Sequence, residues 1–153
     1  MADRRAEALA RLDVFIGDWT VEVRFPGTTA GDAPVARSRF EWTLDRQFLL
    51  QRTEIPVPEA PDGLMLIGAD QETGAYTQHY YDSRGVARLY AMTFDGRTWT
   101  LKREAADFTP LDFHQRFTGT FDDAANTLTA AWETRQEGQD WQLDFDLVYR
   151  RAT

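Results

Sequence analysis

Residues 17–25 read Gly-Asp-Trp-Thr-Val-Glu-Val-Arg-Phe, and this stretch sets the pattern that the rest of the chain repeats. Apolar side chains at every second position, from Trp19 to Phe25, alternate with polar ones, which is typical of a half-buried β-strand. The residues before it follow a different period, because apolar positions from Ala6 to Val14 recur at helical spacing. We therefore expect a short helix over about 3–13, with Asp3 as its N-cap, followed by a strand.

The two-residue period returns repeatedly as far as residue 151. Further strands are predicted over 35–45, 48–55, 64–69, 75–81, 86–94, 97–104, 111–121, 128–135 and 141–150. Short turns such as Asp95-Gly96 and Glu137-Gly138 make sequential strands antiparallel neighbours. Because closing the sheet removes its exposed edges, the prediction is an all-β protein: an antiparallel up-and-down β-barrel of about ten strands over about 18–151. A two-sheet sandwich is the alternative, and residues 1–153 are expected to form a single domain.

Charge and composition exclude several classes of function. Lys and Arg total 17 against 25 Asp and Glu, a net charge of −8, which does not suit binding to a nucleic-acid backbone. The chain has no cysteine, so disulfides, thiolate nucleophiles and cysteine-ligated metals are excluded. No apolar run approaches the ~20 residues of a membrane-spanning helix, and the first residues do not read as a secretory signal. We expect no membrane association and a cytoplasmic location.

The Gly17-Asp18-Trp19 motif, placed after a short helix at the start of the first strand, resembles the lipocalin and wider calycin pattern. In that family the tryptophan closes the base of the barrel and an arginine near the end of the last strand packs over it. The apolar face of the predicted last strand, continued by two, reaches Arg151; that face comprises Trp141, Leu143, Phe145, Leu147 and Tyr149. The resemblance thus implies that Trp19 and Arg151 close the barrel through a cation–π contact.

A longer resemblance covers nearly the whole chain. The stretches 68–76, 79–86, 132–133 and 141–151 are similar to a bacterial lipocalin-like family of uncharacterised function, distantly related to nitrobindins and fatty-acid-binding proteins. Nitrobindins hold haem iron through a histidine near the C-terminus, whereas no histidine follows His114 here. We therefore expect no haem and no other cofactor, and the resemblance supports the fold more than the function.

A barrel of ten strands is wide enough to leave a cavity, which the inward parity would line. The predicted lining is Trp42, Gln78, Tyr80, Arg88, Tyr90, Met92, Trp99, Arg103, Phe113, Gln115, Trp132, Phe145 and Tyr149. Arg88 and Arg103 stand out, because a buried guanidinium needs a partner, water or an anionic ligand. Pairing with an acid such as Glu54 or Asp82, or an extended position at the mouth of the barrel, is the structural alternative.

Other polar residues fall on the outward parity or in turns. His79 and His114 are expected to face solvent or a partner, and no spacing predicts a metal site. Asp144 and Asp146 are expected on the solvated exterior, as is the chain's single lysine, Lys102. Asp82-Ser83-Arg84-Gly85 is interpreted as an ordinary turn between strands, with presentation of an acid and an arginine at the rim as the functional alternative.

Three functions remain open from the sequence. The leading hypothesis is binding of a small hydrophobic or amphipathic molecule, such as a carboxylate, enolate or phenolate, in the barrel cavity. The alternative is a small cavity enzyme of cyclase or isomerase type, in which Tyr80, Tyr90, Arg88 or Gln115 polarises a hydrophobic substrate. The third is a filled barrel that serves as an interaction module. A homodimer supported by exposed aromatics such as Tyr81 is a further expectation.

Overall fold

The computed structural model describes residues 3–27, 35–58 and 60–152. Its elements are α1 (Arg4–Arg11), the short 3-10 helix η1 (Leu12–Phe15), β1 (Gly17–Arg24), β2 (Val35–Thr43), β3 (Phe48–Glu54), β4 (Gly63–Ala69), β5 (Tyr76–Asp82), β6 (Ala87–Phe94), β7 (Thr98–Arg103), β8 (His114–Phe121), β9 (Thr127–Arg135) and β10 (Gln142–Arg151). Every predicted strand is present. The largest boundary error is in β8, which begins at His114 and not at Leu111.

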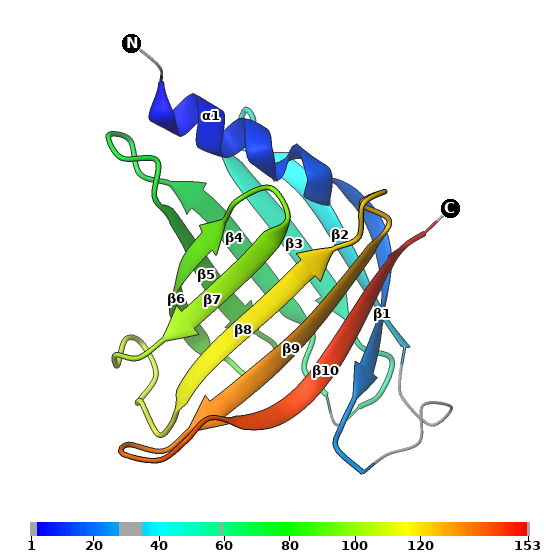
Figure 1. Ribbon diagram of the computed structural model, residues 1–153, viewed down its shortest axis with the longest axis vertical. Helices are drawn as coiled ribbons and strands as arrows, with labels where there is room; N and C mark the ends of the chain where they lie inside the picture. Colours follow the sequence, from blue (N-terminus) through cyan, green and yellow to red (C-terminus); the bar gives the residue numbers. More distant parts are fainter. Residues whose placement is uncertain (1–2, 28–34, 59, 153) are drawn as a thin grey trace.

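The ten strands form one closed antiparallel barrel in sequential order, with β1 hydrogen-bonded to both β2 and β10 (Figure 1). This closure confirms the all-β barrel and excludes the two-sheet sandwich. Helix α1 lies across one end of the barrel, which we call the capped end. The opposite end, which we call the loop end, carries the β3–β4, β5–β6, β7–β8 and β9–β10 connections. Among the described residues, no helix is long and apolar enough to cross a membrane.

The helix is fixed to the capped end by its own capping and by contacts with the strands. The carboxylate of Asp3 accepts a hydrogen bond from the Ala6 amide at 3.0 Å, as the sequence predicts for an N-cap. The Tyr76 hydroxyl donates to the Ala8 carbonyl at 2.5 Å, and Arg5 donates to the Ala69 carbonyl at 3.1 Å. These bonds hold α1 against β4 and β5.

The Gly17–Trp19 motif and Arg151 meet where η1 enters β1. The Arg151 guanidinium lies 4.1 Å from the centre of the Trp19 ring and donates to the Val14 and Ile16 carbonyls, both at 2.8 Å. Gly17 has φ +128°, and a β-carbon there would lie 3.1 Å from the arginine Nη1. A glycine is required here by both the backbone conformation and the space that Arg151 fills.

A β-bulge in β10 corrects one prediction. The ladder with β9 pairs Leu143 with Glu133 and Phe145 with Trp132, so two steps along β10 match one step along β9. Trp141 and Leu143 therefore do not share the inward face of Phe145. The Trp141 ring lies on the outer wall, with the guanidinium groups of Arg116 and Arg135 at 4.4 and 5.3 Å from its centre. The prediction of one continuous inward face from Trp141 to Tyr149 is wrong, because alternation assumes a regular ladder.

Candidate functional site

The interior of the barrel differs between its two ends. At the capped end Phe15 is fully buried, and its ring lies 4.9 to 5.3 Å from the rings of Phe40, Phe94, Trp99 and Phe121. At the loop end several inward residues are only half-buried: Met65, Tyr80, Arg88, Trp132 and Phe145. Solvent therefore reaches the inner wall at the loop end, and a candidate site for a small molecule lies there.

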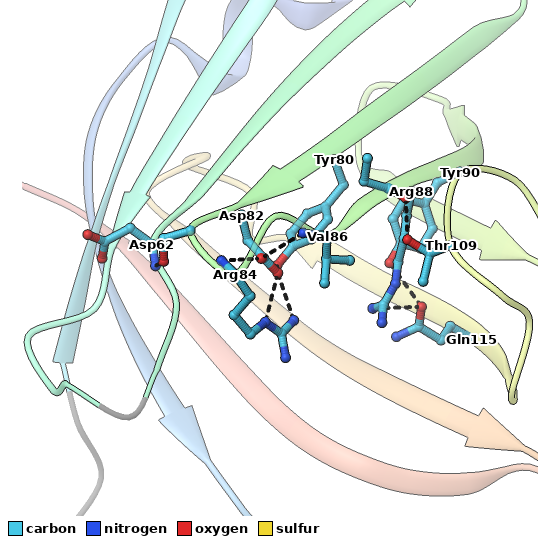
Figure 2. A network of polar contacts seen from close by, with 11 residues as sticks. Asp62, Tyr80, Asp82, Arg84, Val86, Arg88, Tyr90, Thr109 and Gln115 are labelled. Atoms are coloured by element: carbon cyan, nitrogen blue, oxygen red, sulfur yellow. Dashed lines mark hydrogen bonds and ion pairs between the residues drawn. The ribbon is translucent and has the colours of Figure 1, made fainter.

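Three inward polar side chains meet at this end, and we call Arg88, Tyr90 and Gln115 the inner polar cluster (Figure 2). The Tyr90 hydroxyl donates to Gln115 Oε1 at 2.9 Å, while Arg88 Nη1 reaches the same oxygen at 3.5 Å. Burial raises the pKa of Tyr90, although the nearby Arg88 charge acts in the opposite direction. The phenol is thus a neutral hydrogen-bond donor near pH 7.

Arg88 has no carboxylate within ion-pair distance among the residues that the structure describes. Its Nε is buried and has no hydrogen-bond partner, and its guanidinium carbon lies 6.0 Å from the centre of the Phe113 ring. Its polar neighbours in these parts of the chain are Gln115, at 3.5 Å, and the phenol of Tyr90, and neither carries a negative charge. A positive charge on the inner wall is therefore left without a counter-charge.

Arg103 has the opposite environment. Its side chain is 2% exposed and donates from Nε and Nη2 to the Asp107 carboxylate at 3.0 and 2.8 Å. The same Nη2 also donates to the Thr109 carbonyl at 2.6 Å. The bonds from Arg103 to the Asp107 carboxylate hold the pKa of Asp107 well below its ordinary value. Arg103 is thus paired within the protein, and its partner is Asp107 rather than the predicted Glu54 or Asp82.

Asp82 belongs to the turn that the sequence predicts, and its carboxylate organises the rim beside Tyr80 (Figure 2). It accepts from the Tyr80 hydroxyl at 2.8 Å, from Arg84 Nη2 at 2.7 Å and from the Arg84 amide at 2.9 Å. Burial alone would raise the pKa of Asp82, but these hydrogen bonds lower it to about 2. Burial and the adjacent Asp82 charge raise the pKa of Tyr80. Arg84 therefore neutralises this acid and leaves the charge of Arg88 uncompensated.

The remaining predicted lining residues lie deeper in the barrel or outside the cluster. Gln78, Met92, Trp99 and Tyr149 are buried in the packed interior, where burial raises the pKa of Tyr149 to about 12. Trp42 lies at the capped end and donates from Nε1 to Asp13 at 2.9 Å. The structure thus brings together Tyr80, Arg88, Tyr90, Gln115 and Trp132 at the loop end. Phe113, beside Arg88, and Phe145, paired with Trp132, lie at the same end.

The outward residues require one correction. His79 lies half-buried on the outer wall. His114, expected to face solvent or a partner, is buried under the β9–β10 turn of its own chain, with its Nε2 2.8 Å from Glu137. Lys102, Asp144 and Asp146 are exposed, as expected, and Asp144 lies in the β10 bulge. Within the described ranges, no group of three or more acidic or histidine side chains is placed to hold a metal ion.

Sequence reasoning missed the residues that close the wall beside the cluster. Asp107 and Thr109 of the β7–β8 connection bind the backbone of β6, and Met65 adds an apolar side chain opposite Tyr80. The signal that could have found the first two is the Asp-x-Thr spacing, because an aspartate often accepts from the amide two residues on. That bond is present, from the Thr109 amide to Asp107 at 3.0 Å.

Tyr81, named as a support for a homodimer, lies on the outer wall away from the inner polar cluster. It is 41% exposed and borders a groove of about 430 Å³ together with Leu44 and Phe48. Nothing in the groove identifies what would cover it.

Comparisons with known proteins give the fold and no further assignment. No family model matches the chain, and no curated protein matches it. Among solved structures, it is similar to the crystal structure of Rv2717c from M. tuberculosis, with a TM-score of 0.62. The match covers 95% of this chain and 98% of that chain at 15% sequence identity. At this identity the similarity shows the barrel fold alone.

Proposed function

We propose that the protein binds a small amphipathic molecule whose anionic group lies at Arg88 and whose apolar part lies along the inner wall of the loop end. The observation that carries this proposal is the uncompensated guanidinium of Arg88. A charge held on a partly desolvated wall is costly unless it is paired, so a site of this kind favours an anion.

The contrast between the two inward arginines supports the proposal. Arg103 is satisfied by Asp107 and two carbonyl oxygens, whereas Arg88 has only the neutral Gln115 and Tyr90 as polar partners among the described residues. Structural needs therefore explain Arg103 but leave Arg88 unexplained. A carboxylate, enolate or phenolate would supply the missing acceptor, and the Tyr90 hydroxyl lies close enough to contribute to the same polar end.

Aromatic side chains, half-buried except for the buried Tyr90, provide a surface for the apolar part of the molecule. The rings of Trp132 and Tyr90 lie 5.5 Å apart, and those of Tyr80 and Tyr90 lie 6.3 Å apart in an edge-on arrangement. Together with Phe145 they form an apolar wall with few polar groups, which is how small-molecule sites are usually built.

We also propose that the chain is a lipocalin-like barrel of the calycin type. The contact of Arg151 with Trp19 supports this assignment, because it occurs at the positions that the resemblance implies. The proposal concerns architecture, and the ligand class follows from Arg88 and its surroundings.

The first test is native mass spectrometry of gently purified protein, followed by denaturing extraction of any bound molecule. An anionic amphiphile at about one per chain supports the proposal, and its chemistry names the ligand class. A cyclase or isomerase function is favoured instead if the extracted compound is turned over when added back and Tyr80→Phe abolishes turnover while product is still bound. A protein that neither carries nor takes up any anionic amphiphile is better described as a filled barrel with an interaction role.

A further inference from the structure

The barrel wall between β6 and β7 is incomplete at the loop end. The β6–β7 ladder pairs only Ala91–Phe94 with residues 99–102, whereas the other described ladders continue over five or more residue pairs. The first half of β6, from Ala87 to Tyr90, therefore has no ladder partner on this side. We call this interruption the β6–β7 gap.

The β7–β8 connection closes this gap with side chains, and we call residues 104–113 the plug loop. Asp107 Oδ2 accepts from the Leu89 amide at 2.7 Å, and the Thr109 hydroxyl donates to the Ala87 carbonyl at 2.7 Å. Arg103 holds the same loop from within the wall through Asp107 and the Thr109 carbonyl. Two side-chain hydrogen bonds thus take the place of a backbone ladder along β6.

The plug loop lies directly over the inner polar cluster. Arg88 and Tyr90 alternate with Ala87 and Leu89 along β6, so the residues that hold the loop and the residues of the cluster are immediate neighbours. Figure 2 shows Thr109 beside Arg88 and Tyr90, with Gln115 below them. Release of the loop from β6 would therefore open the wall onto the proposed anion site.

Apolar side chains surround the outer side of the gap. Phe108, between the two residues that bind β6, is 74% exposed, and Leu89 is 39% exposed. An amphipathic molecule arriving from solvent would find its first apolar contact here, next to the only part of the β6–β7 wall that side chains close.

We infer that the plug loop opens to let the ligand reach the inner polar cluster, and we call the loop the door. The hydrogen bonds of Asp107 and Thr109 to β6 hold it closed, and we call these two residues the latch. The passage of a ligand through the loop rests on the proposed function, whereas the incomplete ladder and the two latch bonds are independent of it. Opening requires that the two bonds to β6 break and that the Arg103 side chain either moves with the loop or releases Asp107 and the Thr109 carbonyl. The remainder of the barrel keeps its ladders.

The test is stopped-flow fluorescence with anilinonaphthalene sulfonate (ANS), an anionic amphiphile, as the probe. Thr109→Val removes the bond to Ala87, and Asp107→Asn weakens both the bond to Leu89 and the pair with Arg103 that holds the loop. Each variant is expected to raise both the association and the dissociation rate constants about tenfold, the effect of losing one strong hydrogen bond, while Kd changes less than about twofold. If the rates in both variants equal those of the wild type, the plug loop is not the door.

Asp95→Asn is the matched control. Asp95 also caps the β6–β7 pair, accepting from the Arg97 and Thr98 amides at 2.9 and 2.7 Å, but it lies at the capped end. Its rates should match those of the wild type. An equal acceleration in this variant would show that general loosening of the hairpin, not the latch, controls access.

Hydrogen exchange separates failure of the door from failure of the proposed function. The Leu89 amide, held only by Asp107, should exchange faster than the Ala91 amide of the ladder, and Thr109→Val should speed Leu89 alone. If the Leu89 and Ala91 amides exchange at equal rates in every variant, the plug loop does not open as proposed, even if ANS binds. If the wild type does not bind ANS but the exchange pattern is as expected, the loop opens and the proposed function is what fails.

Discussion

The capped end and the loop end of the barrel are made from the same strands but differ in how their interiors are packed and how their charges are paired. At the capped end, Phe15 fills the interior with four neighbouring rings, and Arg151 satisfies the carbonyls left by η1. At the loop end, inward side chains are half-buried and the Arg88 charge has no counter-charge. Aromatic packing is therefore densest at one end of the barrel, while the proposed binding site lies at the other.

The largest expected effect comes from removing the aromatic centre of the capped end. Phe15→Ala should lower the free energy of unfolding by about 4 kcal/mol, because it leaves a cavity between four rings that cannot close. Phe145→Ala, at the half-buried loop end, should cost less than about 2 kcal/mol. Urea unfolding of both variants measures the difference, and equal losses would contradict the division between the two ends.

The two inward arginines provide the next comparison. Arg103→Met should cost about 3 kcal/mol, because it leaves the Asp107 carboxylate without its buried partner. Arg88→Met should leave the free energy of unfolding unchanged or raise it by up to about 1 kcal/mol, since it replaces an unpaired charge with an apolar chain. Chemical denaturation at neutral pH gives both values. A large loss of stability in Arg88→Met would mean that this arginine is structural after all.

Acid should lower the stability of the folded protein by protonating Asp82 at the rim of the loop end. Its folded pKa of about 2 lies below the ordinary value of 3.8, so its contribution is complete above about pH 4 and is lost as pH falls from about 4 to 2. Asp82→Asn should cost about 1.5 kcal/mol at pH 7 and should flatten the pH dependence of stability in that window. Thermal unfolding from pH 7 to pH 2 measures this.

Asp123→Asn is the control for that titration. Asp123 also pairs with an arginine, Arg97 at 2.7 Å, but its side chain is 92% exposed. Its pH profile should follow that of the wild type. A profile in which Asp82→Asn loses stability as steeply as the wild type between pH 4 and 2 would exclude Asp82 as the titrating group.

The last comparison of stability concerns Trp141, where only a small loss is expected. Because the β10 bulge places this ring on the outer wall, Trp141→Ala should lower stability by less than about 1.5 kcal/mol, much of it from the cation–π contacts with Arg116 and Arg135. Trp99→Ala, whose ring is buried at the capped end, should cost more than about 3 kcal/mol. Equal costs would restore the inward position of Trp141 that simple alternation predicts.

The sequence predicts those parts of the fold that local rules determine. Alternation around Trp19 and the short turns are sufficient to specify antiparallel strands, and parity along the last strand brings Arg151 to the side of Trp19. The bulge between Leu143 and Phe145 is different, because it depends on the register in which β9 and β10 pair. Alternation carries no information about that register.

The candidate site was accessible to sequence reasoning only in part. Parity places Arg88, Tyr90 and Gln115 on the inward face, and the structure brings them within hydrogen-bond distance of one another. Parity could not show which of the two arginines has a carboxylate partner, because Asp107 reaches Arg103 through the conformation of a ten-residue connection. The same connection explains why β8 begins three residues later than predicted, since residues 111–113 belong to the plug loop.

One comparison of two probes tests the central claim most directly. ANS and N-phenylnaphthylamine differ in the sulfonate that only ANS carries, so their binding separates the charge from the apolar contact. We predict that the wild type binds ANS at a single site and that Arg88→Met weakens ANS about tenfold or more while N-phenylnaphthylamine changes less than about twofold. If Arg88→Met affects both probes equally, or neither, Arg88 is not the anion site and the proposed function is contradicted.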